Sequence, residues 1–268
     1  MKLRLLLWIL PFALLGSCAR QPAPKPVVTY PNYHKQNLGA SAKDLLSNAV
    51  FTSLTVEVQY VPGFKPDPAT IDTLAAFLSI YLQKCEGIKI VTKELHIKIP
   101  KTLAKDDVAV IEDSARSIYP ADQDLTMYLL FTGSSHPDKN ILGMAYRGTS
   151  AVIFGKSIAA NAGPNKALTR AELETSVLLH EVGHLLGLGN PNGAAANSRT
   201  GKDKKGHCNN KMCLMYSSTE TRNLSVIKRR GKLPHLDKEC LKFLEEIRCQ
   251  AELEEPAGRA ERLQVKLN

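Results

Sequence analysis

The sequence lacks the features of several classes of protein. Its charge is positive, with 35 Lys and Arg against 26 Asp and Glu, but no basic stripe is interleaved with aromatic residues, which make up only 6% of the chain. Because nucleic-acid sites combine basic side chains with aromatic stacking surfaces, we expect no nucleic-acid partner and a solvated basic surface. No internal repeat is visible. The 268 residues, 44% of them hydrophobic, suffice for one domain with its own core.

The N-terminal apolar run is shorter than a membrane-spanning helix requires. Residues 5–15 follow Lys2 and Arg4 and are typical of an export signal. The run ends in Leu-Gly-Ser-Cys18, which resembles the lipobox of bacterial lipoproteins. That resemblance implies cleavage before Cys18 and lipidation of this cysteine. An ordinary secretory signal, cut near the same small residues, is the alternative.

These features divide the chain into four parts. We expect a lipoprotein signal peptide at 1–17, a Pro-rich tether at 18–40, the folded domain at 41–250 and a charged C-terminal tail at 251–268. The protein would then be exported and lipid-anchored to a bacterial membrane, on the periplasmic or the outer-membrane and surface side. We expect it to be a monomer.

Hydrophobic periodicity predicts an α+β domain in which a mixed sheet packs on helices. A capping box formed by Thr169 and Glu172 begins the helix that carries the motif described next, and Gly187 or Gly189 should end it. Two short strands around residues 147–149 form either a plain hairpin or a sheet edge that could bind an extended peptide. The other expected elements are strands at 52–60, 88–99 and 125–132 and helices at 70–84, 105–119 and 236–249.

Residues 180–184 read His-Glu-Val-Gly-His within this apolar helix. Since a helix turns about 100° per residue, His180 and His184 lie one turn apart on one face and can bind one metal ion. Zinc accepts neutral nitrogen ligands, and Glu181 is placed to take a proton from a metal-bound water. The pattern therefore predicts a zinc metallopeptidase, although H-E-x-x-H also occurs in helices by chance.

A catalytic zinc has three protein ligands and an open position, and this motif supplies two. The longer pattern of the metzincins, H-E-x-x-H-x-x-G-x-x-H, continues through Gly187 here, but its last position holds Asn190. An amide oxygen is a poor zinc ligand beside imidazole, carboxylate or thiolate. We therefore look for the third ligand farther along the chain.

The run His207-Cys-Asn-Asn-Lys-Met-Cys-Leu-Met215-Tyr resembles the H-C-x-x-x-x-C-x-M run of archaemetzincins. The resemblance covers about residues 175–216. It implies a zincin or metzincin-like fold, with a twisted mixed sheet, an active-site helix and a methionine turn formed by Met215. It also makes His207 the third zinc ligand, reached through a polar loop at 191–206. The alternatives considered for this ligand are Asp203, Cys208 and Asn190.

The cysteines depart from the archaemetzincin pattern. That family places a later C-x-x-C that completes a structural zinc site, whereas the later cysteines here are Cys240 and Cys249, so a second zinc is not expected. We interpret Cys208 and Cys213 as a short disulfide under the metal, which export would permit, with free thiols or partial metal ligation as alternatives. Cys240 and Cys249 lie on opposite faces of one helix and should not pair, and the partner of Cys85 is left open.

The sequence thus predicts a membrane-tethered zinc endopeptidase that acts on a peptide or protein substrate. One Zn²⁺ ion would be held by His180, His184 and His207, with Glu181 as general base. Two alternatives remain, a catalytically inactive lipoprotein that binds zinc or peptide and a zinc amidase with a non-peptide substrate.

Overall fold

The structure is a computed structural model that describes residues 27–163, 166, 168–189, 206–216 and 233–253. The expected signal peptide, Cys18, the ligand alternatives Asn190 and Asp203 and most of the expected tail lie outside the described residues. Within the described ranges, no helix combines the length and the apolar character needed to cross a membrane.

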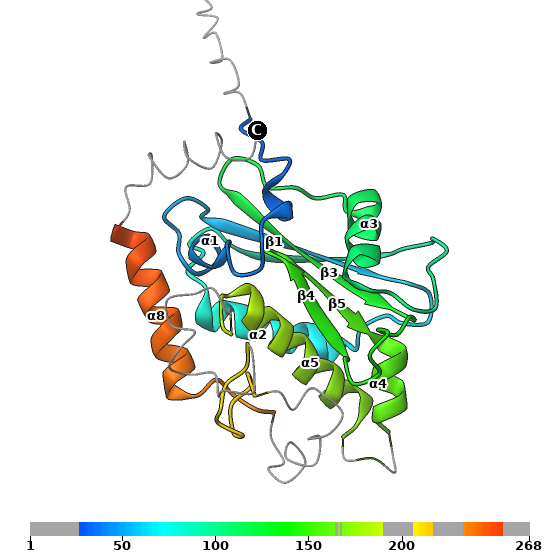
Figure 1. Cartoon of the computed structure of the whole chain (residues 1–268). Coiled ribbons are helices and arrows are strands. Elements are labelled where there is room, and N and C mark those ends of the chain that lie inside the picture. The colour runs from blue at the N-terminus through cyan, green and yellow to red at the C-terminus, as the bar shows by residue number, and fades with distance from the viewer. Residues whose placement is uncertain (1–26, 164–165, 167, 190–205, 217–232, 254–268) are drawn as a thin grey trace, which may run out of the picture.

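One mixed five-stranded sheet forms the centre of the domain (Figure 1). The strand order is β2-β1-β3-β5-β4, with all neighbours parallel except β4, which pairs antiparallel with β5 and lies at the sheet edge. Strand β3 is buried along almost its whole length, as its continuous apolar sequence predicts for a strand covered on both faces. The strands are β1 (Ser53–Tyr60), β2 (Gly87–Glu94), β3 (Asp124–Thr132), β4 (Gly143–Arg147) and β5 (Ser150–Phe154).

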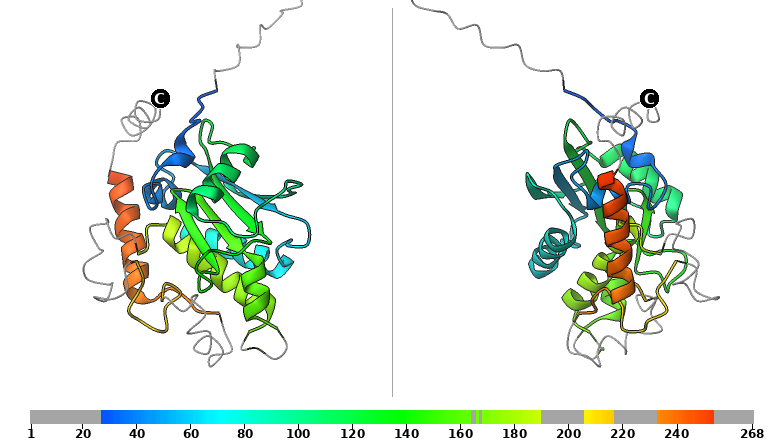
Figure 2. Two further views of the ribbon diagram at one scale, coloured as in Figure 1. Left: turned by 45° about the vertical axis from the view of Figure 1, so that its right-hand side comes forward. Right: turned by 90° about the vertical axis from the view of Figure 1, so that its left-hand side faces the viewer.

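Helices cover both faces of the sheet. Helix α3 packs on one face through a small apolar core that includes Val108 and Ile111, while α2 and α5 pack on the other face in the larger core (Figure 1). Helix α8 runs beside α1 at the end of that layer (Figure 2). The described helices are η1 (Tyr33–Lys35), α1 (Ala42–Leu46), α2 (Pro68–Tyr81), α3 (Lys105–Ala115), α4 (Gly155–Asn161), α5 (Arg170–Leu185) and α8 (Lys238–Leu253).

The expected α+β architecture, a mixed sheet packed on helices, is confirmed. Helix α5 begins at the predicted capping box, in which Thr169 Oγ1 accepts from the Glu172 amide and the Glu172 carboxylate accepts from the Thr169 amide. It ends before Gly187, whose φ of 89° reverses the chain as a left-handed glycine does after many helices. The expected sheet edge is also present, at β4. Helix α4 was not expected, because its seven residues carry no helix-period signal long enough to read.

The N-terminal part of the chain differs from the expected tether. Tyr30, Tyr33 and His34 are buried, and Tyr33 donates to the Asp44 carboxylate over 2.7 Å. The Gly148 amide donates to the Gln36 carbonyl, so this segment packs along the turn between β4 and β5. Prolines disfavour an α-helix here, but they do not prevent a mostly extended chain with the short 3-10 helix η1 from packing on the domain. The packed structure therefore includes residues placed at the end of the 18–40 tether.

Candidate metal centre and cleft

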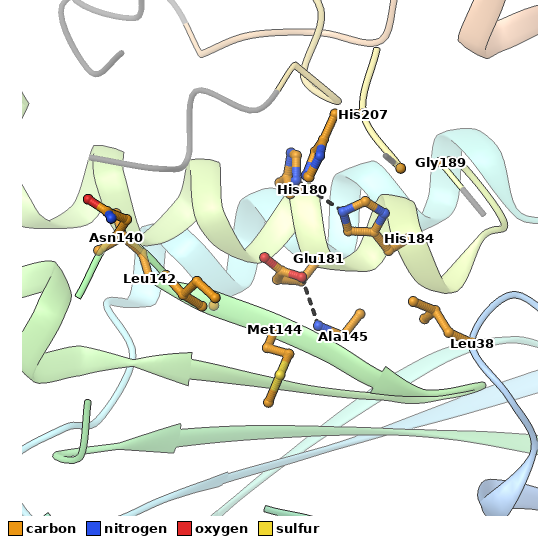
Figure 3. A pocket seen from close by; sticks show the side chains of 13 residues that line it. Leu38, Asn140, Leu142, Met144, Ala145, His180, Glu181, His184, Gly189 and His207 are labelled. Carbon is orange, nitrogen blue, oxygen red and sulfur yellow. Dashed lines mark hydrogen bonds between the residues drawn. The ribbon is translucent and has the colours of Figure 1, made fainter. Parts of the chain in front are cut away.

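Three imidazole rings converge at the C-terminal half of helix α5. His180 and His184 come from adjacent turns of α5 and His207 from the segment that follows the inserted stretch (Figure 3). One ring nitrogen from each lies within 4.8 Å of the other two. The Nε2 atoms of His180 and His184 are 3.1 Å apart, close to the roughly 3.3 Å that zinc–nitrogen bonds of about 2.05 Å subtend in a tetrahedron. These donors fit a zinc ion.

Backbone carbonyls orient the two helical histidines. His180 Nδ1 lies 2.8 Å from the Leu214 carbonyl oxygen and His184 Nδ1 lies 2.9 Å from that of Leu188. A proton on each Nδ1 leaves Nε2 as the free donor, which is how ligating histidines are commonly held. Burial and the neighbouring imidazoles lower the pKa of His180 well below its usual value and that of His184 to about 4. Both rings are therefore neutral at pH 7, as metal binding requires.

Two glycines explain how His207 reaches this site despite the inserted stretch. Gly189 and Gly206 flank residues 190–205, and the two backbones lie so close that a Cβ on Gly206 would be 2.8 Å from the Gly189 oxygen. Both have positive φ, 74° and 85°, which only glycine adopts without strain. The two ends of the inserted stretch therefore lie side by side, and His207 follows directly after its second end. His207 thus follows a point next to Gly189, where the long metzincin motif would place its last histidine.

Met215 lies beneath the histidines. It is 1% exposed, and its sulfur occupies the space where a Cβ on Gly183 would project. Gly183 is the residue before His184, so the helix approaches the methionine directly under the histidines. This is the place that the archaemetzincin resemblance implied for the methionine turn. Tyr216, beside it, is buried as well.

Glu181 faces the cleft between α5 and the edge strand (Figure 3). Its side chain is 6% exposed, and Oε2 accepts a hydrogen bond of 2.8 Å from the Ala145 amide of β4. Burial raises the pKa of Glu181 to about 8, and the bond from the Ala145 amide opposes that rise. A carboxyl group whose pKa lies near neutrality is suited to proton transfer.

The cleft has a volume of about 290 Å³ and is lined mostly by apolar groups. Strand β4 and the residues before it supply Ile141, Leu142 and Met144, and the N-terminal segment supplies Leu38. Among the described lining residues, Glu181 is the only acidic one and none is Lys or Arg. An extended chain with uncharged side chains therefore fits this surface.

A second group of side chains that could hold a metal ion includes residues of the segment that carries His207. Cys208, Cys213, Asp237 and Cys240 each place one donor atom within 4.8 Å of the others. The sulfurs of Cys213 and Cys240 are 3.6 Å apart, near the roughly 3.8 Å expected for two thiolates on one tetrahedral zinc. Backbone amides of Met215 and Asp237 both donate to the Cys213 sulfur over 3.4 Å. Amide donors of this kind stabilise negatively charged thiolates.

The expected Cys208–Cys213 disulfide is wrong for this structure, since both residues are free thiols. The intervening residues form a turn, with the Cys213 amide bonded to the Asn210 carbonyl, and both sulfurs face the start of α8. There Cys208 Sγ lies 3.2 Å from Asp237 Oδ2. Cys85 and Cys249 are exposed free thiols, and Cys240 is buried and unpaired with Cys249.

Comparison with known proteins finds a match at the level of the fold. No protein-family model and no curated protein matches the sequence. The solved structure of archaemetzincin from Methanopyrus kandleri matches with a TM-score of 0.51, covering 73% of this chain and 96% of that chain. The fold matches that of an archaemetzincin. At 18% identity, the likeness establishes the arrangement of sheet and helices and leaves activity to the site itself.

Within the archaemetzincin fold, three site features escaped the sequence reading. Asp237 carries no metal-binding signal in sequence because its position, before α8, is also that of an ordinary helix cap, and its Oδ1 does accept from the Cys240 amide. The spacing Asp237-x-x-Cys240 after the thiol pair was the one available sign. Leu38 was assigned to the tether, and the bond between Ala145 and Glu181 joins positions 36 residues apart.

Proposed function

We propose that this protein is a zinc-dependent endopeptidase. The observation that carries the proposal is the convergence of His180, His184 and His207 beside a buried Glu181 that faces an apolar cleft. The family that the sequence motif resembles consists of zinc peptidases, and the fold agrees with that family. A zinc ion bound by the three imidazoles supplies Lewis-acid chemistry, polarising the scissile carbonyl and acidifying water.

The chain itself provides the positioning and the proton transfer. The peptide lies extended in the cleft, beside the open edge of β4. Glu181 removes a proton from the attacking water and delivers it to the leaving amine. The carbonyls of Leu214 and Leu188 hold the two helical imidazoles in the tautomer that keeps Nε2 free.

Replacing Glu181 with Gln tests the function and its rivals together. Gln has the same size but cannot take up a proton, so we expect kcat on an unfolded protein substrate to fall by about 10²–10⁴-fold, the usual contribution of a general base. Zinc content should stay unchanged. Undiminished cleavage by a zinc-loaded Gln variant would contradict the mechanism. A zinc-loaded wild type that cleaves no member of a broad peptide library would favour a binding protein, and turnover of small amides alone would favour an amidase.

The thiol cluster supports a second zinc ion. In archaemetzincins, as the resemblance implied, a later C-x-x-C completes a structural site; here Asp237 stands at its first position and Cys240 at its second. Three thiolates and a carboxylate form an acceptable closed tetrahedral zinc site. We therefore expect two zinc ions per chain. The double variant His180→Ala/His184→Ala should lose one of them, and Cys213→Ser should lose the other. If the wild type binds one zinc ion per chain and Cys213→Ser binds the same amount, the second site is contradicted.

Export and lipid anchoring through Cys18 complete the proposal. They rest on the charged and apolar character of the first residues and on the Leu-Gly-Ser-Cys18 sequence. Labelling of growing cells with a fatty-acid analogue should mark the wild type and not Cys18→Ser. A mature N-terminus at another residue, without lipid, would indicate an ordinary secretory signal.

A further inference from the structure

The backbone of edge strand β4 faces the cleft at alternate residues. The Phe154 amide donates to the Leu142 carbonyl, and Met144 stands opposite Val152 in the antiparallel ladder. Since hydrogen-bonded and non-hydrogen-bonded positions alternate in such a ladder, Gly143 and Ala145 direct their N–H and C=O groups away from β5. That outer side is the wall of the cleft opposite α5 (Figure 3).

One of these outward groups is already engaged. The Ala145 amide donates to Glu181 Oε2 over 2.8 Å, as Figure 3 shows. The acceptor oxygen belongs to a side chain that is only 6% exposed, and a hydrogen bond shielded from water holds its partners more firmly than one at the surface. One oxygen of Glu181 is thereby fixed on the strand, which leaves Oε1 for proton transfer.

Gly143, two residues before Ala145, lies so close to α5 that a side chain there would clash. A Cβ on Gly143 would lie 2.6 Å from Val177 Cγ1, 2.9 Å from Glu181 Cγ and 3.2 Å from Glu181 Oε1. Any side chain at 143 would therefore push against both α5 and the carboxylate itself. The bare backbone of Gly143 lets the helix approach the strand closely enough for Glu181 to reach Ala145.

We propose that β4 positions the general base as well as the substrate, with Gly143 and the Ala145 amide as the positioning groups for Glu181. A peptide that adds to β4 then finds the N–H and C=O of Gly143 and the C=O of Ala145, but not the Ala145 N–H. The catalytic meaning of this inference rests on the proposed peptidase function, whereas the contact itself does not.

Hydrogen exchange of the Ala145 amide tests the contact without any substrate. This amide lies on the unpaired side of an edge strand, so its protection has to come from Glu181. We expect measurable protection in the wild type and in Glu181→Gln, whose side-chain oxygen still accepts, and a loss of at least tenfold in Glu181→Ala. An unprotected Ala145 amide in the wild type, or equal protection in Glu181→Ala, would overturn the inference even if the protein is a peptidase.

Ala145→Pro removes the donor without removing a ladder bond, since this N–H does not point at β5. Ala145→Gly is the matched variant that keeps the donor. We expect kcat at least tenfold lower in the proline variant than in the glycine variant, with equal zinc content and a similar KM. Equal kcat values would overturn the inference, whereas absence of cleavage by the wild type itself would refute only the proposed function.

Gly143→Ala and the double variant Gly143→Ala/Val177→Ala separate packing from positioning. Removal of the Val177 methyl groups relieves the shortest contact, so the double variant should regain thermal stability relative to Gly143→Ala. The contact with Glu181 remains, and kcat should stay at least tenfold below that of Val177→Ala alone. If kcat recovers together with stability, Gly143 serves packing only.

Discussion

At the scale of single residues, the proposed metal centre depends on glycines as much as on histidines. Gly183 makes room for Met215, Gly143 for Glu181, and Gly189 and Gly206 bring the two ends of the inserted stretch together. In each case a neighbouring group occupies the space that a Cβ atom would fill. Three histidine side chains, of which the first and last are 27 residues apart along the chain, can therefore meet at one point.

Gly206→Ala should weaken zinc binding at the histidine site. Its φ of 85° costs an L-residue roughly 1–2 kcal/mol, and the new methyl group would crowd the Gly189 carbonyl. Because His207 is the next residue, we expect zinc affinity, measured by competition with a chromogenic chelator, to fall about tenfold. Gly63→Ala is the matched control, since Gly63 has a φ of 82° but open space around its Cβ position. Equal losses of zinc affinity in both variants would contradict a local role for Gly206.

At the scale of elements, a charged cluster fastens the edge strand to helix α3. Arg147, at the end of β4, donates to both oxygens of Asp113 over 2.6 and 2.9 Å and to the buried Glu112 over 3.0 Å. Glu112 also accepts from Arg116, which is itself buried. The strand that lines the cleft is thus held from the far face of the sheet, as a positioning strand requires.

The Asp113–Arg147 pair should contribute to stability in a pH-dependent way. Hydrogen bonds from Arg147 lower the pKa of Asp113 from 3.8 to about 2. The stabilisation is therefore complete above about pH 4 and is lost as the pH falls through about 2. Since the Asp113 side chain is 40% exposed, solvent screening leaves about 1 kcal/mol of the full linkage value.

Asp113→Asn should accordingly lower the free energy of unfolding by about 1 kcal/mol at pH 6, and the difference from wild type should shrink as the pH falls from about 4 to about 2. Urea titrations at several pH values measure this difference. Asp72→Asn, an exposed aspartate on α2, removes the same charge as a control. A difference that stays constant down to pH 3 would show that the ion pair is not its source.

At the scale of the whole molecule, one short segment links the two metal-binding groups. Residues 206–216 carry His207, Cys208 and Cys213, and the Leu214 carbonyl in the same segment orients His180. The Leu214 amide in turn donates to the His235 carbonyl just before α8. A metal ion bound at either site would therefore order a segment of the chain that also belongs to the other site.

Removal of metal should lower the melting temperature, and each of the two sites should contribute its own part of the decrease. A ligand that binds only the folded state adds about 2.7 kcal/mol at a free concentration 100 times its dissociation constant. We expect chelation to destabilise the wild type strongly and both His180→Ala/His184→Ala and Cys213→Ser partly, as measured by calorimetry with and without zinc. An equal effect of zinc on all three proteins would contradict the assignment of the two sites.

The local signals in the sequence determined the active-site helix and most of the sheet. Helix α5, its capping box, its glycine stop and the spacing of His180, Glu181 and His184 depend on neighbours within a few residues, and they hold wherever the helix lies. The buried strand β3 and the short strands β4 and β5 could be predicted from the sequence for the same reason. His207 and Met215 were reached through resemblance, because their spacing from the helix obeys no local rule.

Tertiary structure alone decided how these parts meet. The close approach of Gly189 and Gly206, the bond from Ala145 to Glu181 and the joining of Asp237 to three cysteines are contacts between distant positions. The expected disulfide between Cys208 and Cys213 is absent for the same reason, since both sulfurs face the start of α8. Periodicity and spacing describe which face a residue occupies, whereas the partner across the cleft is set only when sheet, helix and loop pack together.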